Sequence, residues 1–150
     1  MALTRANVEY IRGSRLRDLR AALDMSEATS GGNDDLNDPI GYAIRQLGGS
    51  VASVWAVSDS DVAGIAGSDY DELFDLAELR ALETMRSKAR RLTDITAGPR
   101  SDQFSAIAAG LAADIADKRA DIKARYGTGA ATLEAGVLTL DFMQQAESGE

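Results

Sequence analysis

The spacing of apolar residues predicts helices at the start of the chain. Between residues 4 and 24, apolar side chains recur three or four positions apart, which places them on one face of a helix. Gly13 interrupts this pattern, because glycine weakens a helix interior. We therefore expect a bent helix or a short helical pair over residues 4–12 and 14–24. The shared apolar face consists of Val8, Ile11, Leu16, Leu19 and Leu23.

The next region alternates between polar and short apolar segments. Residues 26–37 are small and polar and cannot bury enough surface to offset their ordering entropy, so we predict a mobile surface loop. Asp38 is a good N-cap with Pro39 at the first helical position, and Gly48-Gly49 supplies a stop, which predicts a helix over 39–47. The apolar run 51–57 is too short to distinguish a strand from a helix.

A long helix is predicted over residues 69–92. Ser68 is a candidate N-cap, acidic residues fill the first turn, and arginines stand near the far end, as the helix dipole favours. The apolar residues of this helix form two stripes, so it should have two sets of neighbours. The first stripe contains Tyr70, Leu73, Phe74, Ala77, Ala81 and Met85, and the second contains Leu76, Leu79 and Leu82.

A second long helix is predicted over residues 101–126. The Gly98-Pro99 turn precedes it, Ser101 is a candidate cap, and Gly127 follows its end. We expect the two long helices to form an antiparallel hairpin at the centre of a small, mainly α-helical bundle. The outer face of the second helix should carry two acid-to-base pairs four residues apart, Asp114–Lys118 and Asp121–Arg125.

The pattern changes after Gly127, which divides a helical domain, residues 1–127, from a C-terminal tail, residues 128–150. Apolar and other residues alternate over 137–142 with the period of a strand. A lone strand has few partners in a helical chain, so we predict that this extended tail docks on another protein, for example at the edge of its sheet. The alternatives are packing on its own helices and disorder. The docking residues are Val137, Leu138, Leu140 and Phe142.

Composition supports one helical domain and excludes several kinds of chemistry. The 150 residues are 45% hydrophobic but only 5% aromatic, which suits closely packed helices. The absence of cysteine excludes disulfides and thiolate zinc sites, and the absence of histidine removes the commonest general base and metal ligand. No apolar run is long enough for a membrane span, and the N-terminus lacks the apolar core of a signal peptide.

Three clusters could be given a chemical role, and each has a simpler structural explanation. The acids between Asp69 and Glu78 resemble a divalent-metal site only in charge, and acids are expected at a helix start. Asp59, Asp61 and Gly64 lack the remaining ligands of a calcium loop. The glycine pairs match no phosphate-binding or dinucleotide-binding fingerprint. We therefore expect a protein that is not an enzyme and holds no metal or cofactor.

Charge is distributed in blocks of alternating sign. Residues 1–24, 25–79, 80–126 and 127–150 carry net charges of +2, −10, +4 and −4, within a total of −8. A negative total disfavours a protein that coats nucleic acid, because Lys and Arg supply most of that affinity. The alternating signs indicate that one block faces a block of opposite charge, either within the fold or on a neighbouring copy.

Four stretches together resemble the small head-to-tail adaptor proteins, also called connector or neck proteins, of long-tailed double-stranded-DNA bacteriophages. The likeness as a whole extends over about two thirds of the chain, and four stretches within it carry it. They are DPIGYAIRQLGGSVA at 38–52, the acidic helix DYDELFDLAELR at 69–80, the GPR turn at 98–100 and KRADIKARYG at 118–127.

The resemblance implies a structural virion protein. Such a protein forms a ring, a dodecamer in this family, beneath the portal protein, and is assembled in the host cytoplasm. A C-terminal segment reaches into the portal, the opposite face receives a stopper or tail protein, and DNA passes through the lumen without specific binding. The family has no catalytic residues.

A ring requires each copy to offer two different complementary surfaces. We assign the contact between copies to the helix 69–92. The residues assigned to this contact are Leu76, Leu79, Leu82, Arg86, Arg90 and Arg91. The alternative is a DNA-associated helical regulator or packaging accessory protein that uses the basic group between Arg86 and Arg91, although no aromatic residues interleave it.

Overall fold

The computed structural model describes residues 2–13, 16–26, 31–53 and 55–127, and over these residues the chain is mainly helical with no strand. The predicted fold class is confirmed. The elements in chain order are α1 (Arg5–Gly13), α2 (Arg17–Ala22), η1 (Asp34–Leu36), α3 (Asn37–Gln46), α4 (Asp59–Ala63), η2 (Gly67–Asp69), α5 (Tyr70–Ile95) and α6 (Pro99–Tyr126).

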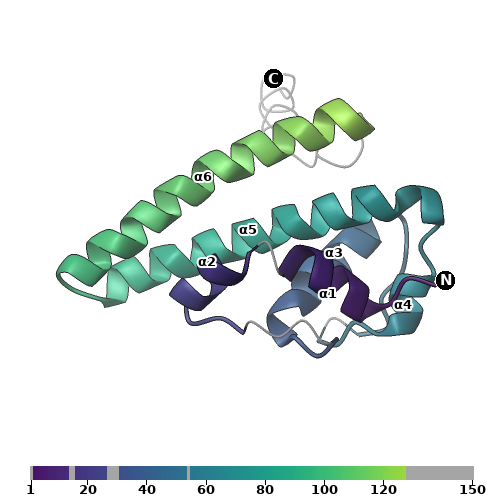
Figure 1. Ribbon diagram of the computed structural model, residues 1–150, viewed down its shortest axis with the longest axis horizontal. Helices are drawn as coiled ribbons and strands as arrows, with labels where there is room; N and C mark the ends of the chain where they lie inside the picture. Colours follow the sequence, from purple (N-terminus) through teal and green to yellow (C-terminus); the bar gives the residue numbers. More distant parts are fainter. Residues whose placement is uncertain (1, 14–15, 27–30, 54, 128–150) are drawn as a thin grey trace, which may run out of the picture.

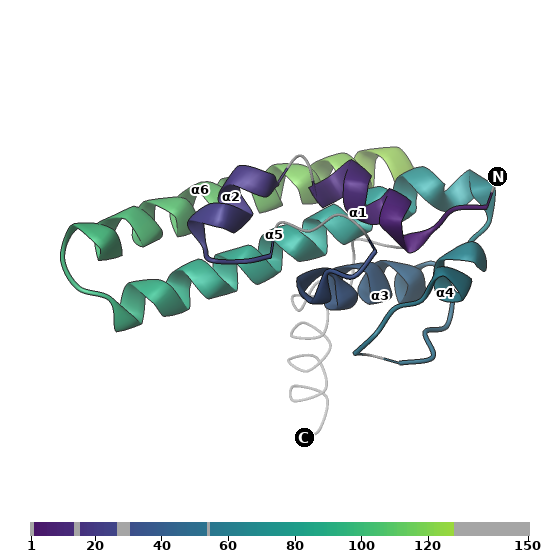
Figure 2. The ribbon, with the colours of Figure 1, turned by 60° about the horizontal axis from the view of Figure 1, so that its bottom comes forward.

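The two long helices α5 and α6 form the predicted antiparallel hairpin (Figure 1). Helix α5 is the middle layer of the molecule. It packs against α6 on one side and against α3 and α1 on the other, and the turned view in Figure 2 also places α6 and α3 on opposite sides of α5. The doubly apolar helix therefore has the two sets of neighbours that its sequence predicts.

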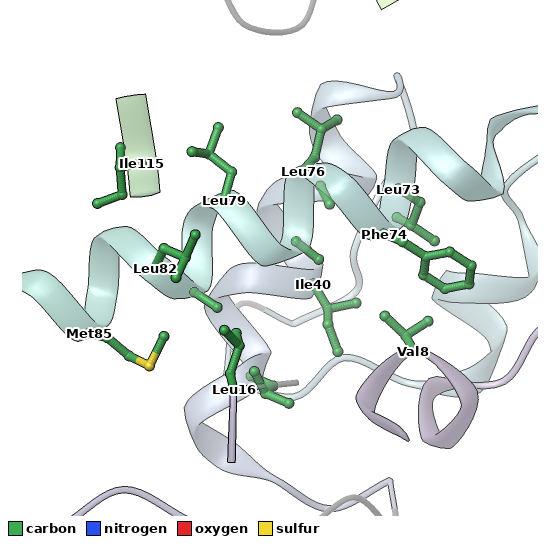
Figure 3. Close-up of a cluster of buried hydrophobic side chains, with 14 of the residues drawn as sticks. Val8, Leu16, Ile40, Leu73, Phe74, Leu76, Leu79, Leu82, Met85 and Ile115 are labelled. Atoms are coloured by element: carbon green, nitrogen blue, oxygen red, sulfur yellow. The ribbon is translucent and has the colours of Figure 1, made fainter. Parts of the chain in front are cut away.

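The core lies on both sides of α5. Leu73 and Leu76 are fully buried, and Val8 and Ile40 bring α1 and α3 against the helix. Figure 3 shows Leu79 directed toward Ile115 of α6, whereas Val8 and Ile40 lie on the other side of α5. Helix α5 therefore joins the two outer layers, α6 on one side and the α1 and α3 layer on the other.

The helix starts differ from the predicted caps. Ser68 lies in the short helix η2, and its hydroxyl donates to Asp69 instead of capping α5. Helix α6 begins at Pro99, because the proline follows Gly98 at φ 75°, so Ser101 falls inside the first turn and its hydroxyl donates to the Thr93 carbonyl oxygen. Both predicted serine caps were wrong.

Part of the predicted mobile loop 26–37 is ordered and buried. Residues 34–36 form η1, and Leu36 is only 5% exposed. Asn33 is buried and caps η1 by accepting a hydrogen bond from the backbone N–H of Asp35. Asn37, the first residue of α3, binds the Trp55 carbonyl oxygen and the Val57 N–H with its side chain. Contrary to the expectation that this segment buries little surface, contacts distant in sequence bury Asn33, Leu36 and Asn37.

The undecided segment 51–57 forms no strand in its described residues, and Val57 alone among them is buried in the core. A helix that the sequence pattern did not reveal, α4, follows it. Ser58 and Asp61 form a reciprocal capping box at its start. The backbone N–H groups of Ser58 and Ala52 donate to Asp61, and these hydrogen bonds lower the pKa of its carboxyl group.

Candidate assembly surface

Helix α6 is packed on one side only. Its buried residues are Phe104, Ala108, Leu111, Ile115 and Ile122, which face α5. The opposite side of the helix is exposed and rich in alanine, with Ala106, Ala109, Ala113, Ala116 and Ala120. The outer layer of the molecule is therefore a long helix whose outward side has no cover within the described chain.

A buried polar cluster fixes α6 against α5. The Lys118 ammonium group lies 2.8 Å from Asp75 and 3.2 Å from Glu78, and both carboxylates are almost fully buried. Arg125 lies 3.3 Å from Asp75 across the same contact. Buried charges tolerate little displacement from their partners, so this cluster specifies the register of the two helices.

Tyr126 completes the cluster. Its hydroxyl donates a 2.8 Å hydrogen bond to Asp75. Burial, followed by the hydrogen bond and the negative charge of Asp75, raises the pKa of Tyr126 to about 12. The phenol therefore remains a donor across the neutral range.

Of the two ion pairs predicted on the surface of α6, one is present and one is not. Arg125 and Asp121 form the expected ion pair at 2.8 Å. Lys118 points instead toward α5, because two buried carboxylates attract it more strongly than one exposed aspartate. Asp114 is exposed and forms no ion pair with any described residue.

An open groove of about 420 Å³, which we call the acidic groove, runs along one flank of α6. Asp114, Asp117 and Asp121 supply its α6 wall, and Leu16 and Leu19 lie opposite. Glu78, Leu82, Lys118 and Arg125 also line it. Asp114 and Asp117 are exposed and form no ion pair with any described residue, so the rim of the groove carries uncompensated negative charge.

A second open groove of about 420 Å³, which we call the basic groove, lies between α5 and α6 near the hairpin turn. Its charged residues are Arg86, Arg90 and Asp94, and small α6 residues form its other wall. The Nε atom of Arg86 is buried without a hydrogen-bond partner, and neither arginine forms an ion pair with a described residue. The groove therefore offers guanidinium groups whose hydrogen-bonding capacity is unused.

The two grooves lie on opposite flanks of α6. Successive residues of an α-helix are about 100° apart around its axis. Ser105, Ala109 and Ala112, which line the basic groove, therefore point roughly half a turn away from Asp114, Asp117 and Asp121. The stripe of residues buried against α5 separates the two flanks. Each copy of the protein thus presents opposite charges on its two sides.

The predicted contact residues separate into two groups. Leu76, Leu79 and Leu82 are 0%, 4% and 5% exposed. Their assignment to a contact between copies is corrected, because these side chains are almost entirely covered by the chain's own helices and leave very little surface for a neighbour. The stripe that these leucines form is buried by other helices of the same chain. The sequence alone does not distinguish such a stripe from one that is exposed to another copy.

The arginines remain on the surface. Arg86 is half-buried, and Arg90 and Arg91 are exposed. Arg91 does not share the basic groove but lines another, with Met25 and Ile95, on a different side of α5. The docking residues Val137, Leu138, Leu140 and Phe142 lie outside the described residues.

Several acids of the clusters considered for metal binding have structural roles. Asp75 and Glu78 bind Lys118, Asp59 accepts a hydrogen bond from the Arg5 N–H, and Asp61 caps α4. Within the described ranges, no group of three or more potential ligands is placed to hold a metal ion. None of the described helices combines the length and apolar composition needed to cross a membrane.

A second buried ionic group, which sequence reasoning missed, ties the N-terminal layer together. Arg5 and Glu9 pair at 2.9 Å within α1. Arg5 also donates to the carbonyl oxygens of Val57 and Asn33, and Glu9 accepts from the backbone N–H groups of Gly31 and Asn33. The spacing of Arg5 and Glu9 is the only local signal of this group, since its other partners are distant in sequence.

No protein-family model matches this chain, and no curated protein or solved structure matches it. The function of the chain is therefore inferred from its sequence pattern, its fold and the two grooves.

Proposed function

We propose that this protein is a structural virion protein that assembles with copies of itself, as a head-to-tail adaptor in the neck of a long-tailed bacteriophage. It forms a ring, a dodecamer, beneath the portal protein and links the capsid to the tail. It has no catalytic role in this proposal. The resemblance of residues 38–52, 69–80, 98–100 and 118–127 to such adaptors supports it.

The observation that carries the proposal is the pair of oppositely charged grooves on the two flanks of α6. Two different complementary surfaces on one chain are what a heterologous contact requires. Such contacts generate a closed ring when the rotation between copies closes. A single self-complementary patch would instead favour a two-fold dimer.

Charge also suits a ring through which DNA passes. The total charge is −8, and residues 25–79 carry −10. Negative charge around a lumen repels phosphates, so DNA moves through it without being held. In this proposal the tail residues 137–142 dock on the portal, and the opposite face of the ring receives a stopper or tail protein. Assembly takes place in the host cytoplasm before the protein enters the virion.

The proposal is tested by measuring the mass of the purified full-length protein, alone and mixed with the portal protein of the same phage, by native mass spectrometry. We expect a ring of copies, or a stoichiometric complex of copies on the portal. A protein that stays monomeric at high concentration and ignores the portal would overturn the proposal.

The unpaired arginines of the basic groove favour one alternative, a DNA-associated helical regulator or packaging accessory protein. In that case the arginines contact phosphates, and the affinity for duplex DNA falls steeply as salt rises. Replacing Arg86 and Arg90 by alanine would then abolish binding to DNA. A structural adaptor shows no such loss, because it has little affinity for DNA at the outset.

A further inference from the structure

We propose that the basic groove of one copy receives the exposed carboxylates Asp114 and Asp117 of the next copy. This inference rests on the proposed function, since it names the contact through which the copies assemble. Arg86 and Arg90 provide the cations, and the occupant of the groove is the acidic flank of α6 of a second copy.

The arginines of the basic groove lack acidic partners within the described chain, so they are able to bind carboxylates of another copy. Most other arginines on the long helices are paired: Arg80 with Asp38, Arg119 with Glu83, and Arg125 with Asp121. Arg86 and Arg90 have no such partner among the described residues, and the buried Nε of Arg86 lacks an acceptor. A buried donor without an acceptor is costly, and a carboxylate is the strongest acceptor a protein supplies.

The spacing of the exposed carboxylates on α6 resembles the spacing of these arginines on α5. Asp114 and Asp117 stand one turn apart on the exposed flank of α6, and Arg86 and Arg90 stand one turn apart on α5. The carboxylates are three residues apart and the guanidinium groups four, each close to one helical turn, so the long arginine side chains can reach both carboxylates. The small residues Ala108, Ala109 and Ala112 along the basic groove permit close approach of another helix.

The position of the two surfaces gives the contact a direction. Because they lie on opposite flanks of α6, the acidic flank of one copy faces the basic groove of its neighbour when copies stand side by side and are shifted along the helix axis, since Asp114 and Asp117 lie further along α6 than the residues of the basic groove. Each copy then uses both flanks, and the contact repeats around the assembly. A nucleic acid would need the arginines only and would leave the acidic flank without a role.

The first test reverses one charge surface at a time in the full-length protein. Arg90→Glu makes the basic groove acidic, and Asp114→Lys with Asp117→Lys makes the acidic flank basic. Each variant places like charges in contact, so each should weaken self-association at least about tenfold, measured by analytical ultracentrifugation. The replaced side chains are exposed, so the monomer should keep its helix content by circular dichroism.

The decisive test mixes the two variants. In an equimolar mixture, the charge-reversed basic groove of the Arg90→Glu protein faces the charge-reversed acidic flank of the double-lysine protein. The other type of contact, between an unaltered basic groove and an unaltered acidic flank, is that of the wild type. Assembly should therefore return in the mixture, with the two chains alternating. Chains labelled with different isotopes would show this alternation by native mass spectrometry.

Arg86→Met separates assembly from folding. It removes the buried Nε that has no acceptor, so the melting temperature of the monomer should not fall, whereas association between copies should weaken. Arg45→Glu and Asp71→Lys are the matched controls, since both residues are exposed and stand outside the two grooves. Neither control should alter association more than about twofold.

The outcomes separate this inference from the proposed function. Assembly of the wild type that survives both charge reversals, or that is lost in each variant without return in the mixture, overturns the contact described here and leaves the adaptor proposal standing. A wild type that never assembles, alone or on the portal, overturns both. Binding of duplex DNA that is lost in Arg90→Glu and unaffected by the lysine variant overturns the contact in favour of a DNA role.

Discussion

Helices α5 and α6 are nearly equal in length, 26 and 28 residues, but they have opposite roles. Eleven residues of α5 are buried and five of α6. The difference arises from position, because α5 has a layer on each side and α6 on only one. Burial on two sides commits nearly every apolar residue of α5 to the fold. One-sided packing leaves α6 the surface on which partners can be recognised.

The largest expected effect is a cavity beside α5. Leu76 is fully buried, so Leu76→Ala should lower the free energy of unfolding by about 3 kcal/mol, measured by urea denaturation. Ile107→Ala is the matched change on α6, where the side chain is only partly buried, and it should cost about 1 kcal/mol. Equal losses at the two sites would contradict the assignment of α5 as the inner layer.

The next effect concerns the buried cluster that joins the two helices. Lys118→Met leaves Asp75 and Glu78 buried with less compensating charge, so it should cost about 3 kcal/mol or slightly less, since Arg125 and Tyr126 still contact Asp75. Lys123→Met, an exposed change on the same helix, should stay within about 0.5 kcal/mol. Thermal unfolding of both variants gives the comparison, and a neutral Lys118→Met would show that the cluster does not hold α6 in place.

A smaller effect is expected at Tyr126. Tyr126→Phe removes one hydrogen bond to a carboxylate and should cost about 1.5 kcal/mol at neutral pH. The folded pKa of about 12 lies above the ordinary value of 10.0, so folding favours the protonated phenol. Its stabilising contribution is fully present below pH 10 and is lost as the pH rises toward 12. The wild type should therefore lose more stability than Tyr126→Phe over this interval in alkaline denaturation curves.

Ultraviolet titration provides an independent check on Tyr126. The chain has four tyrosines, and the difference between the titrations of the wild type and Tyr126→Phe isolates this one. A midpoint near the ordinary value would argue against the contact with Asp75.

The smallest effect is expected on the outer side of α6. Ala113 is exposed, so Ala113→Gln should change the free energy of unfolding by less than about 0.5 kcal/mol. Ala81→Gln in α5 is the contrasting change, because this alanine is 5% exposed and a larger polar side chain must displace its neighbours. If Ala113→Gln destabilised the monomer as much as Ala81→Gln, the outer side of α6 would have to be covered within the chain.

The hairpin could be predicted from sequence because its signals are local. Apolar periodicity and the Gly98-Pro99 break lie within the helices that they define. The caps at Ser68 and Ser101 were mispredicted, because a short helical turn and a proline at the first position can start a helix equally well. The burial of Asn33 and Asn37 was not predicted, because it depends on Arg5, Glu9 and Trp55, which are far away in the chain.

The candidate surface was predicted in part. Arg86 and Arg90 stood out as a basic cluster, but the leucines beside them were assigned to the same contact. Whether an apolar stripe meets another copy or the chain's own next helix depends on tertiary packing. Asp114 is left without its predicted ion pair because Lys118 turns toward Asp75, which lies on another helix. A spacing of four residues predicts an ion pair only when no stronger partner lies within reach.

The central place of α5 has a consequence for synthesis of the chain. One of its neighbours precedes it in sequence and the other follows, so the N-terminal layer can pack as soon as α5 leaves the ribosome. Until α6 emerges, Leu79 remains open to water and Asp75 lacks its lysine. The nascent protein thus passes through a half-covered stage that is prone to aggregation, and completion of the last helix ends it.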